Sequence, residues 1–207
     1  MPKKIAFFEV YLHECDKSEV VPSEYRMGST FFDNLKSIIT LAQKNSLPTV
    51  RFELEDDYHY LDEGYEKELT KKLLKTGKPV KLSRPLKPNV KFQYDERSIS
   101  QYKAVILTGI SPTDVRYIHP QKYRTVESVI DDLKKEGIET AIVVGGFLGE
   151  CVGDIIRFYI KNQLTVLVPY DATNERREGF DNAKKEIEKL GAKILTTEEL
   201  ISRVFES

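Results

Sequence analysis

The chain has little of what several classes of protein require. Its 207 residues include two cysteines, three histidines and no tryptophan. Two cysteines cannot form a disulfide framework, and nothing requires Cys15 and Cys151 to pair, so we expect a reducing compartment, the cytoplasm. The N-terminal Met-Pro-Lys-Lys-Ile-Ala leads into a strand pattern without the apolar core of a signal peptide. No apolar run is long enough to span a bilayer, so we expect no membrane partner.

An excess of basic residues is also missing. The chain has 32 Lys and Arg against 33 Asp and Glu, which gives a formal net charge of -1. General binders of nucleic acid or of anionic membranes need a basic excess, so we expect no nucleic-acid partner. With 40% hydrophobic and 31% charged residues, the composition is typical of a soluble globular protein. The length suits one domain with a three-layer core.

Strand patterns and helix patterns alternate along the sequence. Apolar and β-branched runs predict six strands, at residues 4–12, 49–54, 104–110, 140–144, 164–168 and 193–195. Apolar residues at helical spacing predict helices near residues 30–45, 126–136, 151–160, 179–190 and from 196 onward. This alternation is typical of right-handed βαβ crossovers. We therefore predict an α/β fold with three α/β/α layers around a mainly parallel six-stranded sheet, similar to a Rossmann fold.

The region from about residue 55 to 103 breaks this alternation. It holds a charged helix candidate and then Pro79, Pro85 and Pro88 in a basic, extended stretch. A structureless loop of that length is uncommon in a compact domain. We predict a single domain over residues 1–207 with an insertion at about 55–103, which either borders the site or is a solvated decoration without function.

Cys151 lies at the most informative position in the chain. It follows the run Ala141-Ile-Val-Val-Gly-Gly-Phe-Leu-Gly-Glu and opens an amphipathic helix. Ligands of parallel α/β sheets bind outside the carboxyl ends of the strands, and the positive end of a helix dipole there favours the thiolate, which is the nucleophilic form. The alternative is that Cys151 only fills a seam between helix and sheet, as buried free cysteines commonly do.

Several motifs are absent from the glycine-rich stretch. There is no G-x-G-x-x-G pattern, no Lys-Ser/Thr pair after the glycines and no G-x-S-x-G elbow. A histidine-based triad would need His13, His59 or His119, and none is obviously placed for it. The candidate chemistry therefore rests on Cys151 and on an acid, Glu9, that ends the first strand.

Two segments together resemble the isochorismatase-like cysteine hydrolases, a superfamily that includes nicotinamidases and carbamoylsarcosine amidohydrolases. They are Ile5-Ala-Phe-Phe-Glu-Val10 and Val143-Val-Gly-Gly-Phe-Leu-Gly-Glu-Cys-Val152. Downstream, residues 165–173 resemble the family's strand and D-A-T turn, and residues 191–200 resemble its closing strand and helix. The resemblance covers both ends of the chain and its C-terminal half, and it leaves residues 55–103 unexplained.

This resemblance implies a triad of Asp, Lys and Cys, in which the cysteine attacks a carbonyl carbon and an acyl-enzyme forms. Cys151 matches the nucleophile, Glu9 falls on the Asp position with one methylene more, and Thr108 stands where the family has Lys. A cation beside thiol and carboxylate would lower the thiol pKa. Without it, either the helix dipole contributes more or another lysine reaches the site, for which the candidates are Lys91, Lys103 and Lys122.

The resemblance also implies an oxyanion hole built from backbone. Its donors would be the amides of Cys151 and Phe147, with a cis peptide bond between Gly146 and Phe147 that costs ~3 kcal/mol. Asp57 and His59 resemble the metal pair of nicotinamidases. Two ligands are too few for a stable zinc site, so we expect neither metal nor cofactor.

Two functions follow from these residues. The first is a hydrolase of a small-molecule amide or related C–N bond, which works through a thioester at Cys151 with Glu9 as the base. The second is a catalytically inactive module of the same fold that binds a ligand or supports assembly, as the replacement of the family Lys by Thr108 suggests. In either case the resemblance implies a small-molecule partner and a homo-oligomer.

Overall fold

The computed structural model describes residues 4–10, 30–54, 99–107, 122–146, 148–173, 175 and 180–206. The strands are β1 (Ile5–Val10), β2 (Thr49–Leu54), β3 (Tyr102–Leu107), β4 (Arg124–Thr125), β5 (Thr140–Gly145), β6 (Thr165–Pro169) and β7 (Lys193–Leu195). The α-helices are α1 (Phe31–Lys44), α4 (Val126–Lys135), α5 (Cys151–Lys161), α6 (Phe180–Lys189) and α7 (Thr197–Val204). Two short 3-10 turns are η2 (Ile99–Gln101) and η4 (Tyr170–Ala172). None of the helices in this part of the chain has the length and hydropathy that a bilayer crossing requires.

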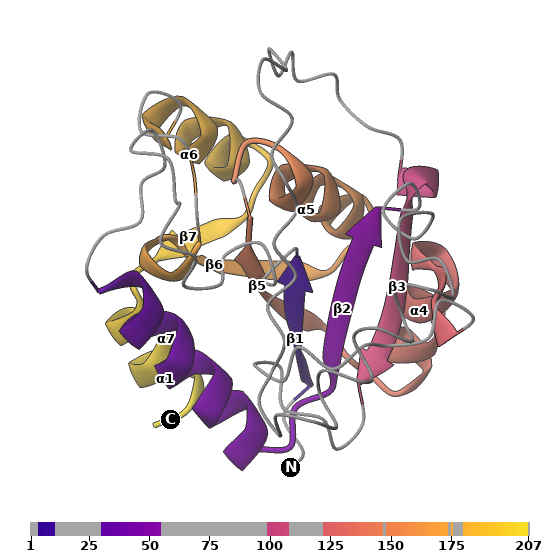
Figure 1. The fold of residues 1–207 in the computed structure, drawn as a ribbon, viewed down its shortest axis with the longest axis horizontal. Coiled ribbons are helices and arrows are strands. Elements are labelled where there is room, and N and C mark those ends of the chain that lie inside the picture. Colours follow the sequence, from indigo (N-terminus) through magenta and orange to yellow (C-terminus); the bar gives the residue numbers. More distant parts are fainter. Residues whose placement is uncertain are drawn as a thin grey trace, which may run out of the picture.

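The strands form one seven-stranded sheet in the order β4-β3-β2-β1-β5-β6-β7 (Figure 1). The five strands β2, β1, β5, β6 and β7 run parallel to one another. Their carboxyl ends therefore share one edge of the sheet, where Val10 of β1 lies beside Gly145 of β5. The predicted α/β class and the mainly parallel sheet are confirmed.

The predicted sheet differs from the observed one in strand number and in the direction of β3. Strand β3 runs antiparallel to β2, so that Tyr102 pairs with Leu54 and Leu107 pairs with Thr49. An apolar run predicts a strand but carries no information about its direction, and an antiparallel neighbour needs no crossover helix. The seventh strand, β4, is antiparallel to β3 and consists of two exposed polar residues, which form no apolar pattern to detect.

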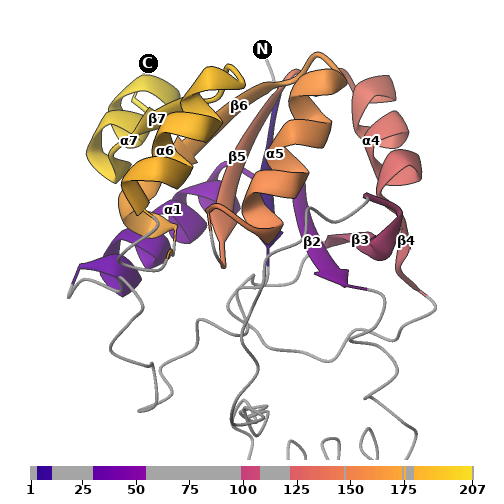
Figure 2. The same ribbon diagram turned by 90° about the horizontal axis from the view of Figure 1, so that it is seen from above.

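Helices cover both faces of the sheet, which gives the three predicted layers. One core cluster joins β1 residues Ala6, Phe8 and Val10 to the inward faces of α4, α5 and α6. The other joins Phe7 to α1 and α7. Figure 2 shows α4, α5 and α6 in a row, and Figure 1 shows α1 and α7 side by side away from them. Side chains of a strand alternate between faces, so these clusters assign every position of β1 to one face or the other.

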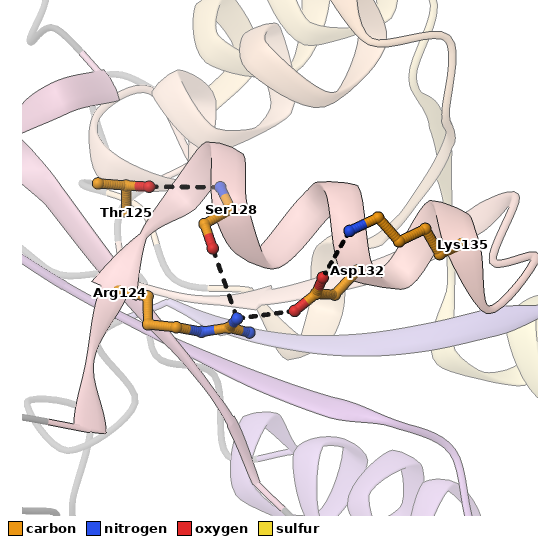
Figure 3. Close-up of polar contacts among 5 residues, drawn as sticks. All are labelled: Arg124, Thr125, Ser128, Asp132 and Lys135. Carbon is orange, nitrogen blue, oxygen red and sulfur yellow. Dashed lines mark hydrogen bonds and ion pairs between the residues drawn. The ribbon is translucent and has the colours of Figure 1, made fainter.

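The helix ends follow from capping residues in the sequence. Thr196 and Glu199 form a capping box at the start of α7, with Glu199 N donating to Thr196 Oγ1 at 3.1 Å. Thr125 caps α4 by accepting from the amide of Ser128 (Figure 3). Arg124 reaches along that helix and donates to Asp132 at 2.7 Å. The Arg124 and Lys135 side chains on either side of this exposed carboxylate hold the pKa of Asp132 below its usual value.

Gly145 ends β5 in a conformation that only glycine adopts readily. Its φ is +142°, and a Cβ there would lie 1.8 Å from the carbonyl oxygen of Val10. The next amide, that of Gly146, donates to the same oxygen at 2.7 Å. The backbone of β5 is therefore pressed against β1 where the chain turns toward α5, and this contact leaves no room for a side chain.

We predict that Gly145→Ala prevents stable folding or lowers the free energy of unfolding by more than ~3 kcal/mol, because the atoms in the way are backbone. Gly191→Ala is the matched control, since its φ is +103° but a Cβ there meets nothing within 4 Å. That change should cost only ~1–2 kcal/mol of backbone strain. Urea unfolding measures both, and equal losses would contradict the role given to the Val10 contact.

Candidate active site

The carboxyl edge of the sheet places Cys151 where the sequence predicts. Strand β5 ends at Gly145, and α5 begins at Cys151 after a short turn. Cys151 is partly exposed and packs against the core cluster beneath α4, α5 and α6. The residue is therefore not fully buried, and its burial does not require a purely space-filling role.

The turn before α5 is held from outside the helix. The amide of Gly149 donates to the carboxylate of Glu175, whose side chain is buried. A Cβ at Gly149 would lie 3.0 Å from that carboxylate and 3.2 Å from Cβ of Ala183 on α6. The φ of Gly149 is not positive, so its backbone conformation does not require glycine. Its small size serves instead to let Glu175 and α6 approach the turn.

A buried polar chain lies next to Cys151 on α5 and β3. The Tyr102 hydroxyl donates to Asp154 Oδ2 at 2.8 Å, and Arg157 Nη1 donates to Asp154 Oδ1 at 3.1 Å. Asp154 is 4% exposed and follows Cys151 by one helical turn. Burial raises the pKa of Tyr102 far above its usual range, and its contacts with Cys151 and Asp154, including a hydrogen bond to each, raise it further.

Glu9 and Arg51 form a second polar group on neighbouring strands. They are register partners on β1 and β2, and Arg51 Nε lies 3.0 Å from Glu9 Oε2. The Glu9 side chain is fully buried, and that of Arg51 is 11% exposed. Alternation along β1 places Glu9 on the same face as Phe7, the face of the α1 and α7 cluster. Cys151 packs against the cluster of the opposite face.

Two predicted members of the site lie outside the described residues. They are Thr108 and Phe147, so the Thr108 role, the Phe147 amide and the cis bond to Gly146 stay predictions. Leu107, which precedes Thr108, pairs with Thr49 at the amino end of β2. Leu107 is therefore at the edge of the sheet opposite to Gly145.

The structure describes two of the three lysines that the sequence analysis proposed as substitutes for the family Lys. Lys103 lies on β3 opposite Glu53, and strand alternation gives it the face of Arg51 rather than that of Tyr102. Lys122 is exposed just before β4. The third candidate, Lys91, lies outside the described residues. The cation seen beside Glu9 is thus the guanidinium of Arg51, which the sequence analysis did not propose.

A metal site can be examined only for part of the chain. Where the structure describes the residues, no three His, Cys, Asp or Glu side chains gather closely enough to hold a metal ion. The Asp57 and His59 pair lies outside that part.

Comparison with known proteins gives the fold. No protein-family model and no curated protein matches the sequence. Among solved structures, the MAR1 ribonuclease from Caenorhabditis elegans is 20% identical, with a TM-score of 0.57 over 100% of this chain and 83% of that one. An isochorismatase family protein from Burkholderia thailandensis is 15% identical, with a TM-score of 0.57 over 100% of both chains. A cysteine hydrolase from Pseudomonas syringae pv. phaseolicola is 13% identical, with a TM-score of 0.58 over 100% of this chain and 94% of that one.

The chain has the isochorismatase-like fold. The fold-level resemblance predicted from the segments around Glu9 and Cys151 is therefore confirmed. The low identities show the architecture alone, so the activity has to be argued from this chain's own residues.

Three polar residues of this candidate site, Arg51, Tyr102 and Asp154, were missed by the sequence analysis. Two of them, Arg51 and Asp154, had a detectable signal. Arg51 is a charge inside the predicted strand at 49–54, and Asp154 is a charge among the apolar residues of the helix after Cys151. Buried charges need partners, so both positions pointed to a pair. Tyr102 could not be placed, because its position depends on the antiparallel direction of β3.

We predict that Arg51→Met lowers the free energy of unfolding by ~3–5 kcal/mol at neutral pH, because the buried Glu9 carboxylate loses this counter-charge. The loss should shrink as the pH falls, since protonation removes the charge that lacks its partner. The control is the double variant Glu9→Leu/Arg51→Met, which should recover most of the loss. Urea unfolding at several pH values measures this, and a double variant as unstable as the single one would contradict it.

Proposed function

We propose that the protein is a cysteine-dependent hydrolase of small-molecule amides or related C–N bonds. The observation that carries the proposal is Cys151, which is partly exposed at the first position of α5, at the carboxyl edge of an isochorismatase-like sheet. The dipole of an 11-residue helix favours the ionised thiol at this end. The Glu150 side chain does not cap the helix.

The reaction then proceeds through a thioester. The Cys151 thiolate attacks the carbonyl carbon, the C–N bond breaks, and the amine leaves with a proton. Water then attacks the thioester, which releases the carboxylic acid product and regenerates the Cys151 thiol. The family resemblance assigns the role of base to Glu9, which in this proposal receives the thiol proton across the carboxyl edge of the sheet, because its side chain and Cys151 lie toward opposite faces, and passes it to the amine. Arg51 supplies the positive charge beside Glu9 that the resemblance assigns to Lys. The amides of Cys151 and Phe147 would stabilise the oxyanion.

The second candidate is the inactive module of the same fold. The antiparallel direction of β3 favours it, because Leu107, the last residue of that strand, lies at the edge of the sheet opposite to Cys151. Such a module would keep the architecture and the buried Glu9–Arg51 pair, and Cys151 would behave as an ordinary thiol.

A panel of small primary amides separates these functions, with ammonia release as the readout. Turnover should fall by at least ~1000-fold in Cys151→Ser and by at least ~100-fold in Glu9→Gln. Cys15→Ser is the matched control for loss of a thiol and should leave turnover unchanged. Turnover that survives in Cys151→Ser would contradict the proposal. No turnover of any amide, together with alkylation of Cys151 at the rate of a free thiol, would favour the inactive module.

Short single-stranded RNA belongs in the same panel, because one structural neighbour is named a ribonuclease. The net charge of -1 gives this chain no overall attraction for polyanions. We expect no cleavage of RNA. Cleavage that Cys151→Ser abolishes would change the substrate class and keep the cysteine.

We further propose that the protein acts in the cytoplasm as a homo-oligomer, as the resemblance implies for the fold. Sedimentation of the purified full chain tests the second part, and a single monomeric species at micromolar concentration would contradict it.

A further inference from the structure

Tyr102 is a buried side chain near Cys151 whose position bears on the chemistry of the thiol. Strand β3 begins at Tyr102, which pairs with Leu54 at the carboxyl end of β2. The antiparallel course of β3 therefore brings its first residue, not its last, to the edge where α5 starts. Tyr102 is fully buried in the same core cluster against which Cys151 packs.

Asp154 holds the Tyr102 hydroxyl in place. It lies one turn after Cys151, so both side chains lie on the same side of α5. It accepts from Tyr102 at 2.8 Å and from Arg157 at 3.1 Å, and Arg157 approaches Glu186 of α6 at 4.0 Å. A buried carboxylate with two donors is a fixed anchor, and the hydroxyl that it binds is also in hydrogen-bonding contact with Cys151.

We propose that Tyr102 is a positioning residue for Cys151: its hydroxyl donates to Asp154 in the resting protein and turns to donate to the Cys151 sulfur when that sulfur is ionised. This rests on the proposed function for its consequence, since the ionised sulfur is the attacking group. The hydroxyl rotates and keeps its proton, the thiol proton goes to Glu9, and Arg157 remains on Asp154. The number of protons is therefore conserved.

The charges around Cys151 set the direction of each expected effect. On its own helix are Asp154 and Arg157, and Glu150 precedes it. From other elements come the Tyr102 hydroxyl on β3 and Glu175, which follows η4 and accepts from Gly149 in the turn before α5. The Glu9–Arg51 pair of β1 and β2 lies toward the opposite face of the sheet. Tyr102 can donate to the thiolate and so favours it, whereas the negative charge of Asp154 disfavours it. Removing the Tyr102 hydroxyl should therefore raise the pKa of Cys151, and neutralising Asp154 should lower it.

The test measures the pH dependence of alkylation by iodoacetamide in a Cys15→Ser background, so that Cys151 is the sole cysteine. In Tyr102→Phe the midpoint should rise by about one unit, with alkylation about tenfold slower at neutral pH. In Asp154→Asn the midpoint should fall, with alkylation several-fold faster at neutral pH. A Tyr102→Phe profile that overlays the parent, or both variants moving in the same direction, would overturn the proposal.

Tyr159→Phe is the matched control. Tyr159 lies in the same core cluster and its buried hydroxyl has no hydrogen-bond partner among the described residues. Loss of that hydroxyl should leave the alkylation profile unchanged. A shift equal to that of Tyr102→Phe would show a general packing effect and would overturn the proposal.

A second measurement leaves Tyr102 and Asp154 unchanged. The S–H stretching band of Cys151 in the native Cys15→Ser protein should lie at lower frequency than in the urea-unfolded protein, because the thiol is hydrogen-bonded. An unshifted band would count against the contact. Neither readout uses a substrate, so opposite midpoint shifts without amide turnover would support the Tyr102 role while the proposed function fails. Amide turnover together with an unchanged alkylation profile in Tyr102→Phe would support the proposed function while the Tyr102 role fails.

Discussion

The close backbone contact between Val10 and Gly145 is the constraint on which the geometry of the site depends. Strands β1 and β5 are neighbours along their whole length, and at their carboxyl ends the space between them is too small for a Cβ. This contact fixes where β5 stops and the chain turns toward α5. Because Cys151 is the first residue of that helix, the position of the sulfur follows from a backbone contact made six residues earlier.

Charge is buried on both sides of this edge, and each buried charge has a partner. Glu9 is paired with Arg51, and Asp154 is bound by Tyr102 and Arg157. Burying ionised groups costs several kcal/mol each unless they are paired and hydrogen-bonded. A hydrophobic core of this size does not need buried carboxylates such as Glu9 and Asp154 for stability. Their concentration at the ligand-binding edge of an α/β sheet is what makes the site a functional candidate rather than a packing detail.

The predictable part of the molecule is the part governed by local patterns. Strand runs and helical stripes located β2 and β7 to the residue, and the hydroxyl of Thr196 with Glu199 marked the start of α7. The direction of β3 could not be predicted, because the apolar pattern of residues 102–107 is the same for a parallel and for an antiparallel strand. The partners of Cys151 depend on that direction, so Tyr102 was unpredictable even though Glu9 and Cys151 were not.

The direction of β3 also decides what can replace the lysine of related hydrolases. A parallel strand would deliver its last residues to the site, and an antiparallel one delivers its first. In this chain the first residue is a tyrosine held by a carboxylate, and the cation at the site belongs instead to β2. The two proposals together divide the electrostatic work of one lysine, to hold a negative charge on an acid and to stabilise a thiolate, between Arg51 at Glu9 and Tyr102 at Cys151. They describe a fold that keeps a cysteine at the start of α5 and changes the groups around it.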